Sequence, residues 1–441
     1  MADEKAPTRN AFGEPWPDFN DGLTYTDIVP PTSTTATVQN SPKKCPRIRA
    51  CSLIEFYSSK YSNSAPLEGW LQRIRNGQIT VDGQVVTDPD TTLRVGSVLL
   101  YSRLPWKEPY APYLLEVLYE DDDMVAINKP SGLQVLPGGL FQQRTVLTQL
   151  RWLAEKSSAL RFSGIAAAQE SHPVPVHRLG RGTSGILLCA KTKLARARLA
   201  AYFADGTAVV RENRISDVEL GTTRRISKIY RALATGIIDE DEVVVKQAIG
   251  MMRYPGVANG LYVASSSGKP AFSKVRVLER DVQGNCTLVQ VVSSIYHMRS
   301  VSLVEIQSGR PHQIRIHLSF LGHPLLGDPL YGIDGQPKVA ESGCGDDSFA
   351  PDGGYQRPTK PVPGDCGYHL HAHHLVLSHP TKNESNKEAC YATPLQSPPS
   401  TCQYATTSSS MAKWCIIQAV HQVIEITAPL PTMLRAQNET E

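Results

Sequence analysis

The alternation of apolar and polar residues divides the chain into a short module and a longer, strand-rich region. Apolar residues within 70–74 recur at helical spacing, and Gly77 stands where such a helix should end. The stretch ITVDGQVV then alternates around an Asp-Gly pair at 82–83, which is typical of a β-hairpin turn. We therefore expect a small helix-plus-hairpin module over residues 47–105.

Beyond residue 113 the pattern becomes a series of apolar runs separated by turns. Strands are expected at LLEVLYED, MVAINKPSG, KIYRALATGII, FSKVRVLER, CTLVQVV, SLVEIQSG, HLHAHHLVLSHP and VIEITAPLP. Helical spacing marks TVLTQLRWLAEKSSAL, ARARLAAYFADG and PHQIRIHLSFLG, the last with Pro311 at a first-turn position. These elements predict one large domain over residues 113–431, followed by a short tail at 432–441.

Three segments show no sustained period. Residues 1–46 are rich in Pro, Thr, Asp and Asn, which predicts a flexible N-terminal arm. Residues 333–367 are full of Gly, Pro, Asp and Ser, and residues 381–411 of Ser, Thr and Pro. Both are expected to be surface insertions in the large domain.

The charge balance restricts where a polyanion could bind. Lys and Arg number 45 against 42 Asp and Glu, so the formal net charge is only +3. A nucleic-acid surface must then be a local patch, since there is no field over the whole protein. Such a patch is present, because residues 171–204 contain several Lys and Arg and no Asp or Glu.

Cysteine usage and hydropathy bear on the compartment. The nine cysteines form no CxxC pair, and the N-terminus has no apolar core of the secretory type. We expect an intracellular, reducing compartment, with cytoplasm, nucleus and organelle all open. No run of about 18 apolar residues occurs, so no membrane span is expected. The protein is also predicted to be a monomer.

One short stretch, HRLGRGTSG at residues 177–185, has the form of a catalytic loop but contains no carboxylate. It also belongs to a larger pattern. HRLGRGTSGILL, KIYRALATG, SGRPHQIRIHLSFLGHPLLGDPLYG, AINKPSGLQVLP and LHAHHLVLSHP resemble motifs of the RluA family of RNA pseudouridine synthases. The module at 47–105 resembles that family's S4-type RNA-binding domain.

The resemblance implies a fold and a reaction. The fold would be α+β, with a mostly antiparallel central sheet flanked by helices and a small N-terminal S4-like α/β module. The target uridine would be flipped out of its stack. The C1′–N1 bond would then break and the uracil would rejoin through C5, without a cofactor.

The resemblance also assigns residues. The family pattern HRLDxxTSG aligns without a gap, and Gly180 occupies the position of its catalytic Asp. Tyr230, in the KxY pattern with Lys228, matches an active-site Tyr that stacks on the base. Arg315 matches the Arg that pairs with the catalytic Asp, and Arg178 matches an Arg that positions the nucleotide.

Glycine at position 180 leads to a specific expectation for Arg315. Without its usual partner, Arg315 should recruit an anion: an RNA phosphate, a solvent ion or a carboxylate such as Asp328. Turnover should be very low. Gly180→Asp should raise it and should also improve thermal stability by restoring the pair with Arg315.

RNA contacts are predicted in two places. Arg178, Arg181, Lys191 and Arg196 lie in the basic stretch, and Arg73 and Arg75 lie on the predicted helix of the module. A solvated helix face is the alternative for that last pair. The partner is expected to be an rRNA or a tRNA, with neither favoured.

Three functions compete on this evidence. They are an RNA pseudouridine synthase, an RNA-binding protein of the same fold that has lost the chemistry, and a metal-dependent hydrolase. The first two differ by whether a carboxylate reaches the site. The third would use His369, His371 and His373, which alternation places on one strand face, but no metal is expected, because LHA before an apolar strand is also a structural pattern of the family.

Overall fold

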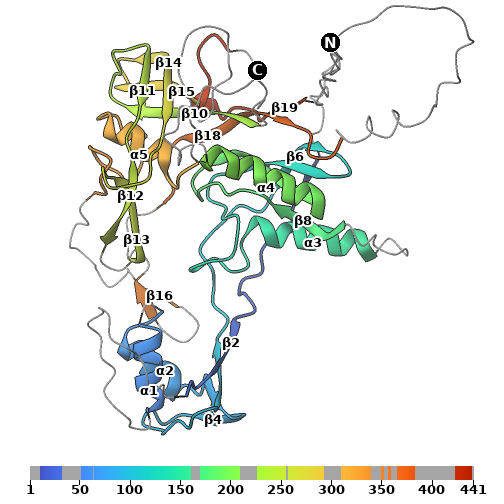
Figure 1. Ribbon diagram of the computed structural model, residues 1–441, viewed down its shortest axis with the longest axis vertical. Helices are drawn as coiled ribbons and strands as arrows, with labels where there is room; N and C mark the ends of the chain where they lie inside the picture. Colours follow the sequence, from blue (N-terminus) through green and yellow to red (C-terminus); the bar gives the residue numbers. More distant parts are fainter. Residues whose placement is uncertain are drawn as a thin grey trace, which may run out of the picture.

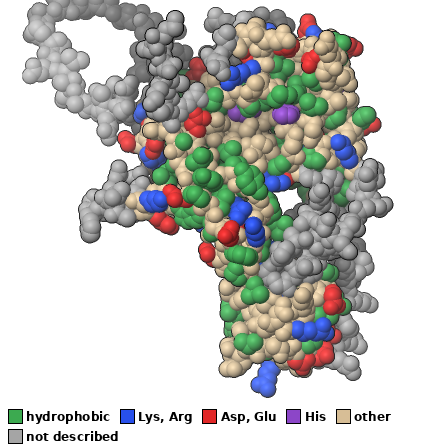
Figure 2. Space-filling model, turned by 180° about the vertical axis from the view of Figure 1, so that it is seen from behind, with side chains coloured by type: hydrophobic (Ala, Val, Ile, Leu, Met, Phe, Trp, Pro, Cys, Tyr) green, Lys and Arg blue, Asp and Glu red, His purple; other side chains and the backbone are tan. Residues whose placement is uncertain are grey.

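The protein is described from a computed structural model that places residues 10–31, 51–62, 64–159, 169–208, 226–254, 257–292, 309–338, 349–351, 356–358, 365–382 and 423–439. A small lobe, labelled with α1, α2, β2 and β4, lies at the lower end of the view in Figure 1. A larger lobe built around a long sheet lies above it. Figure 2 shows the same two lobes from behind, with acidic and basic side chains intermingled over that face.

The larger lobe is organised by an 11-stranded sheet. Its order is β1-β6-β7-β9-β18-β10-β15-β14-β11, with β8 added to β9 and β19 to β18. Among the strand pairings that the structure describes in this sheet, only β9 with β18 is parallel, which confirms the mostly antiparallel α+β fold. The strands are β1 (Ala11–Phe12), β6 (Leu115–Glu120), β7 (Met124–Lys129), β8 (Gln169–Pro175), β9 (Ser184–Thr192), β10 (Ile226–Thr235), β11 (Glu242–Val245), β14 (Ser273–Asp281), β15 (Cys286–Val292), β18 (Leu370–Ser378) and β19 (Val423–Thr427).

Three helices cover this sheet, each through apolar side chains four residues apart. They are α3 (Val146–Ala159), α4 (Lys193–Ala208) and α5 (Gln313–Phe320). Residues four apart share a helix face, and full burial of such a side chain contributes about 1.5–3 kcal/mol. The buried pairs are Val146 with Leu150, Ala195 with Leu199, and Ile314 with Leu318.

The small lobe confirms the predicted helix and hairpin. A four-stranded sheet runs in the order β2-β5-β3-β4 beside two helices. Asp82 and Gly83 have φ of 49° and 85°, as the mirror-image turn of a tight hairpin requires. The elements are α1 (Leu53–Lys60), α2 (Leu67–Arg75), β2 (Leu23–Ile28), β3 (Ile79–Val81), β4 (Gln84–Val86) and β5 (Val98–Arg103).

Residues 10–31 correct the prediction of a flexible arm over 1–46. We call them the N-terminal strap, because β1 pairs with β6 of the large sheet and β2 pairs with β5 of the small one. Between these strands Trp16 donates to the Ala111 carbonyl at 2.9 Å and the buried Asn20 donates to Glu108 at 2.8 Å. Trp16 and Ala111 are 95 residues apart in the chain, so no local period reveals such contacts.

The remaining described elements are short. Two further hairpins are formed by β12 (Ile249–Tyr254) with β13 (Val257–Ala264) and by β16 (Phe349–Pro351) with β17 (Gln356–Pro358). A 3-10 turn, η3 (Thr432–Leu434), follows β19. Most of the expected strand SLVEIQSG and most of both expected insertions fall outside the described residues. Within the described part of the chain, no helix is long and apolar enough to span a membrane.

Candidate active site

The loop at 177–183 connects β8 to β9 and is fixed by backbone hydrogen bonds. The Gly180 carbonyl accepts from the Thr183 amide at 3.1 Å, which closes a tight turn. The two following carbonyls bind the segment after β7: Arg181 O accepts from the Gly132 amide at 2.9 Å, and Gly182 O accepts from Ser131 Oγ at 2.7 Å. Gly180 itself is exposed at the top of this turn.

Lys129 links the 177–183 loop to the segment that follows β7. Its side chain is fully buried, and Nζ donates to the carbonyls of Pro130 at 2.8 Å, Leu133 at 2.8 Å and Arg181 at 3.1 Å. Burial lowers the pKa of Lys129 to about 7, while three carbonyl acceptors favour the ammonium form. Lys129 therefore acts as a structural clamp that fixes the position of the 177–183 loop relative to the segment after β7.

Tyr368, two residues before β18, covers the same loop from the other side. A β-carbon built on Gly180 would lie 3.1 Å from Tyr368 Oη and 3.4 Å from Thr183 Oγ1. The Thr183 and Tyr368 hydroxyls are themselves 3.2 Å apart. Because the φ of Gly180 is not positive, an L-residue fits there once the Tyr368 hydroxyl shifts by a few tenths of an ångström.

Gly182, in contrast, leaves no room for a side chain. A β-carbon there would lie 2.6 Å from the Asp365 carbonyl oxygen and 2.8 Å from two ring carbons of Tyr368. We expect Gly182→Ala to lower the free energy of unfolding by about 1–3 kcal/mol through overpacking. Urea unfolding of the purified variant measures this. Gly309→Ala is the control, because its β-carbon meets nothing within 4 Å; equal losses in the two variants would contradict the packing described.

Arg315 is paired with Asp328, the carboxylate named among the anions that this cation was expected to recruit. It is 2% exposed and forms two hydrogen bonds with Asp328, from Nε at 2.7 Å and from Nη2 at 2.7 Å. Its guanidinium carbon lies 4.2 Å from the Tyr368 ring centroid. The Asp328 carboxylate also accepts the amides of Leu330 and Tyr331. Gly180→Asp therefore has no unpaired Arg315 to restore, and the predicted gain in stability loses its basis.

A second carboxylate, Asp365, lies beside the loop. Asp365 Oδ1 accepts from Arg181 Nε at 2.8 Å and also pairs with Arg181 Nη2. Burial works to raise the pKa of Asp365, but the hydrogen bond and charge of Arg181, together with the charge of Arg315, hold it below its usual range. The Asp365 side chain is 46% exposed, so an ionised carboxylate faces solvent at the rim of the loop.

Tyr230 on β10 packs near the 177–183 loop. It is half-buried and packs both against the cluster that contains Leu179 and Ala372 and against the cluster that contains Tyr368. Burial raises the pKa of Tyr230 to about 12, so its phenol is neutral at physiological pH. The structure thus brings together Gly180, Tyr230 and, through Tyr368, Arg315.

His177 and Lys228 belong to the support of this loop. His177 Nε2 accepts from the Leu188 amide at 3.0 Å, and burial holds its pKa well below the usual range. Lys228 Nζ lies 3.9 Å from the Phe203 ring centroid, and burial lowers the pKa of Lys228 to about 7. A neutral His177 that accepts a backbone hydrogen bond serves to position the loop.

The predicted RNA contacts differ in accessibility. Arg178, Arg196 and Arg75 are exposed. Lys191 is half-buried and pairs with Glu120 at 3.0 Å, and Arg181 is half-buried against Asp365 and lies 4.8 Å from the Phe141 ring centroid. Three of the six residues are therefore exposed enough to reach a phosphate.

Arg73 is not placed to contact RNA as predicted. The residue is 1% exposed, with its guanidinium carbon 4.7 Å from the Trp70 ring centroid and 5.2 Å from that of Tyr101. A cation held between two aromatic rings in a core cannot line a phosphate. Periodicity placed Arg73 on the helix correctly, but it could not show that the small sheet covers that face.

The histidines of β18 each make a structural contact through Nδ1. His371 Nδ1 lies 2.8 Å from Ser184 Oγ, and His373 Nδ1 donates to the Ala428 carbonyl at 2.9 Å. His374 Nδ1 lies 3.1 Å from Thr427 Oγ1. Where the structure describes the chain, His369, His371 and His373, the ligands of the alternative metal site, do not bring three ligand atoms together.

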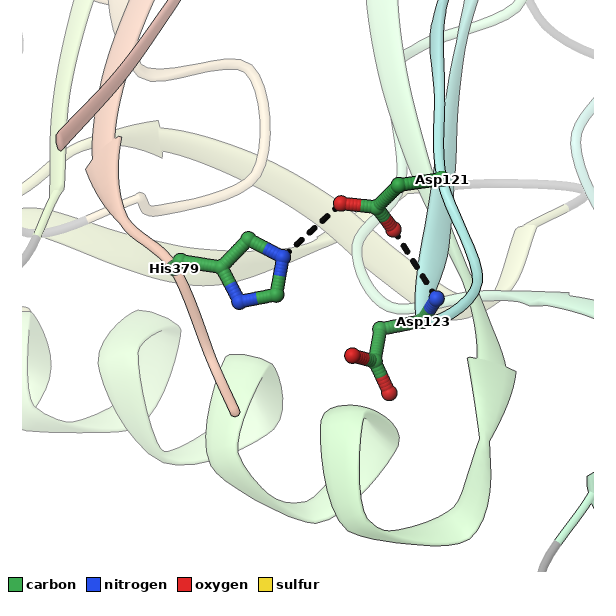
Figure 3. A group of neighbouring side chains, drawn as sticks. All are labelled: Asp121, Asp123 and His379. Carbon is green, nitrogen blue, oxygen red and sulfur yellow. Dashed lines mark hydrogen bonds and ion pairs between the residues drawn. The ribbon is translucent and has the colours of Figure 1, made fainter. Parts of the chain in front are cut away.

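Asp121, Asp123 and His379 form the cluster in Figure 3 that most resembles a metal site. The side-chain oxygens of Asp121 and the ring nitrogens of His379 already take part in hydrogen bonds within the protein. Asp121 Oδ1 accepts two amides at 2.9 Å, and Asp121 Oδ2 binds His379 Nε2 at 2.8 Å. His379 Nδ1 accepts the Thr381 amide at 3.1 Å. The cluster ties the β6–β7 turn to the end of β18. It lies at the opposite end of β7 and β9 from Gly180, since Met124 pairs with Ala190 and Lys129 with Gly185.

Comparison of the sequence with known proteins places this chain in a class of RNA-modifying isomerases. The chain belongs to the RNA pseudouridylate synthase family, whose model matches residues 123–320. It is 54% identical over 437 residues to RNA pseudouridine synthase 5 of Arabidopsis thaliana, covering 99% of this chain and 100% of the relative. It is 59% identical over 389 residues to RNA pseudouridine synthase 5 of Oryza sativa subsp. japonica, covering 87% and 91%.

A more distant relative confirms the RluA-type resemblance. The ribosomal large subunit pseudouridine synthase D of Vibrio vulnificus is 31% identical over 325 residues, which cover 72% of this chain and 79% of the relative. Sequence motifs therefore identified the family correctly. They did not identify Lys129, Ser131, Asp365 or Tyr368. The first two lie in the motif NKPSG, where Pro and Gly indicated only the end of a strand, and Asp365 lies in a stretch interpreted as an insertion.

Proposed function

We propose that this protein isomerises uridine to pseudouridine in structured RNA. The observation that carries the proposal is the convergence of the 177–183 loop, Tyr230 and the Tyr368–Arg315 stack in a chain of this family. In the reaction the C1′–N1 bond breaks with its electron pair on N1, and C5 bonds to C1′. The proton displaced from C5 ends on N1, so neither an oxidant nor a cofactor is required.

The site residues take distinct roles in this proposal. Tyr230, half-buried and neutral, provides a ring face for the flipped uracil. Arg178, exposed two residues before Gly180, neutralises a phosphate beside the flipped nucleotide. Arg315 is a positioning residue, because it is buried and supports Tyr368 from behind.

Two surfaces are proposed to bind the RNA. One is the 171–204 segment, where Arg178 and Arg196 are exposed, and the other is the small lobe, which we propose to be an S4-like module with Arg75 exposed on α2. The RNA is proposed to be an rRNA or a tRNA, and the name of the Vibrio vulnificus relative favours rRNA. The protein is proposed to act as an intracellular monomer.

The activity test is direct. Purified protein is incubated with total cellular RNA, and pseudouridine is measured in nuclease digests by mass spectrometry. We expect new pseudouridine with the wild-type chain and none with heat-denatured protein. Failure on all RNA fractions, with RNA still bound tightly, would instead establish the alternative of an RNA-binding protein that has lost the chemistry.

The RNA surface gives a separate prediction. Arg178→Ala with Arg196→Ala should weaken RNA binding and flatten its dependence on salt, because each lost phosphate contact reduces counterion release. The slope of log Kd against log salt should fall by roughly 1–2 for the two contacts. The control is Arg253→Ala with Arg276→Ala, two exposed arginines on β12 and β14. Equal slopes in both double variants would locate the RNA elsewhere.

A further inference from the structure

We propose that Asp365 supplies the carboxylate that this active site lacks at Gly180. The proposal rests on the proposed isomerase activity and concerns which side chain acts on the sugar. With glycine at position 180 the loop carries no carboxylate, and a missing covalent participant is not replaced by neighbouring dipoles. Some other carboxylate has to reach the same place.

Asp328 cannot be that group. Its side chain is 0% exposed, and both oxygens are occupied: Oδ2 by Arg315 Nε, and Oδ1 by Arg315 Nη2 and two backbone amides. A nucleotide has no route to it. Freeing it would also leave Arg315 buried without a counter-ion, which is strongly unfavourable.

Asp365 meets the requirements that Asp328 fails. The contacts that Arg181 and the Cys366 thiol make with its carboxylate, the latter at 3.7 Å, are all to Oδ1. In the described part of the chain no other residue donates to Oδ2. The side chain is 46% exposed, so one oxygen is oriented by Arg181 while the other is available to a substrate.

The backbone of Asp365 places this carboxylate at the loop. Its carbonyl oxygen would lie 2.6 Å from a β-carbon on Gly182, and the Tyr368 side chain that follows lies against both Gly180 and Gly182. Residues 365–368 therefore run along the turn from which the family's Asp projects. Glycine at 182 permits this approach, because any side chain there would displace the segment.

Tyr368 does not itself replace the missing group. Burial raises the pKa of its phenol, so it is a neutral hydrogen-bond donor beside Thr183 and cannot act as a base at physiological pH. Asp365 is ionised there, because its charge is balanced by Arg181 and Arg315. Tyr368 thus places a neutral hydroxyl beside Gly180, and Asp365 places an anion at the edge of the loop.

The chemical step can be written for Asp365 Oδ2. The oxygen bonds to C1′ of the flipped nucleotide while the C1′–N1 bond breaks and its electron pair stays on N1. The uracil turns, C5 attacks C1′, and the bond between C1′ and Oδ2 breaks to return the carboxylate, while the proton displaced from C5 ends on N1. If Asp365 instead acts as a base, it takes the C2′ proton as the C1′–N1 bond breaks and returns it when C5 bonds to C1′.

The experiment compares three variants with the wild-type full-length chain, scoring pseudouridine formation in RNA and RNA affinity. Asp365→Asn removes the charge at nearly constant shape and should lower kcat by about 10²- to 10⁴-fold, with RNA affinity within a few-fold. Arg181→Met removes the ion pair but keeps the carboxylate, so its loss of kcat should be at least tenfold smaller. Gly180→Asp in the Asp365→Asn background should recover part of the lost rate, because position 180 accepts a side chain.

Each outcome is decisive. An Asp365→Asn variant as active as wild type overturns the role of Asp365 and leaves the isomerase activity standing. Equal losses in Asp365→Asn and Arg181→Met show that Asp365 only positions Arg181, which also overturns it. A wild-type chain that forms no pseudouridine in any RNA removes the proposed function itself, and with it this role. A large loss confined to Asp365→Asn, partly reversed by Gly180→Asp, supports the proposal.

Discussion

Replacing Asp328 by asparagine should lower the free energy of unfolding by about 3–5 kcal/mol, the usual cost of breaking a buried ion pair by removing one charge. In the Asp328→Asn variant the side-chain amide oxygen can still accept from the Leu330 and Tyr331 amides and from Arg315 Nη2. The change therefore removes the negative charge and the hydrogen bond from Arg315 Nε. Arg315 is 2% exposed and would keep its charge without a counter-ion. Denaturant unfolding, followed by tryptophan fluorescence, measures the difference.

Asp241→Asn is the matched control for this prediction. Asp241 also pairs with an arginine, Arg280, at 2.7 Å, but its side chain is 90% exposed. Exposed pairs contribute about 0–1 kcal/mol, so this variant should be nearly as stable as the wild-type chain. Similar losses in the two variants would show that the Arg315–Asp328 pair is not buried as described.

Lys129→Met should have an effect of comparable size on stability and a larger one on activity. Methionine fills a similar volume but leaves the carbonyls of Pro130 and Leu133 without the donor they now have. Each unsatisfied buried carbonyl costs about 1–3 kcal/mol, which gives a loss of roughly 2–6 kcal/mol for the two. Because Lys129 also binds the Arg181 carbonyl, the loop should shift and pseudouridine formation should fall by at least roughly 100-fold, as misplacement of reacting groups by about 1 Å can do.

Lys156→Met is the control, because Lys156 is 62% exposed and pairs with Glu14 at the surface. It should change the free energy of unfolding by less than about 0.5 kcal/mol. The two lysine variants are compared by denaturant unfolding and by pseudouridine formation. A fully active Lys129→Met chain would mean that the loop keeps its position without the clamp.

Local patterns were sufficient for the elements that carry the site. The apolar spacing in QIRIHLSF predicted α5, and the alternation in HLHAHHLVLS predicted β18, because burial of one face forces these periods. Pro311 was expected inside the first turn of α5, whereas it precedes the N-cap His312. Such small shifts arise because a period fixes the face of an element better than its end.

The contacts inside the site could not be derived in this way. Tyr368 meets Thr183 across 185 residues of chain, and Asp365 meets Arg181 across 184. No periodicity encodes such contacts, since they depend on the parallel pairing of β9 with β18. The Arg315–Asp328 pair spans only 13 residues, yet the family pattern assigned Arg315 to an absent Asp. The sequence offered Asp328 only as one of several possible anions for Arg315, and the structure identifies it as the partner.

The N-terminal strap has a consequence for how the chain is made. Its strands β1 and β2 leave the ribosome before their partners β6 and β5, which end at Glu120 and Arg103. At roughly 5–20 residues per second, β2 waits about 4–15 s for β5, and β1 waits about 5–22 s for β6. The strands of the strap are therefore translated before the strands with which they pair but can be placed only after them, and until then the edges of β5 and β6 that they cover stay open to other chains.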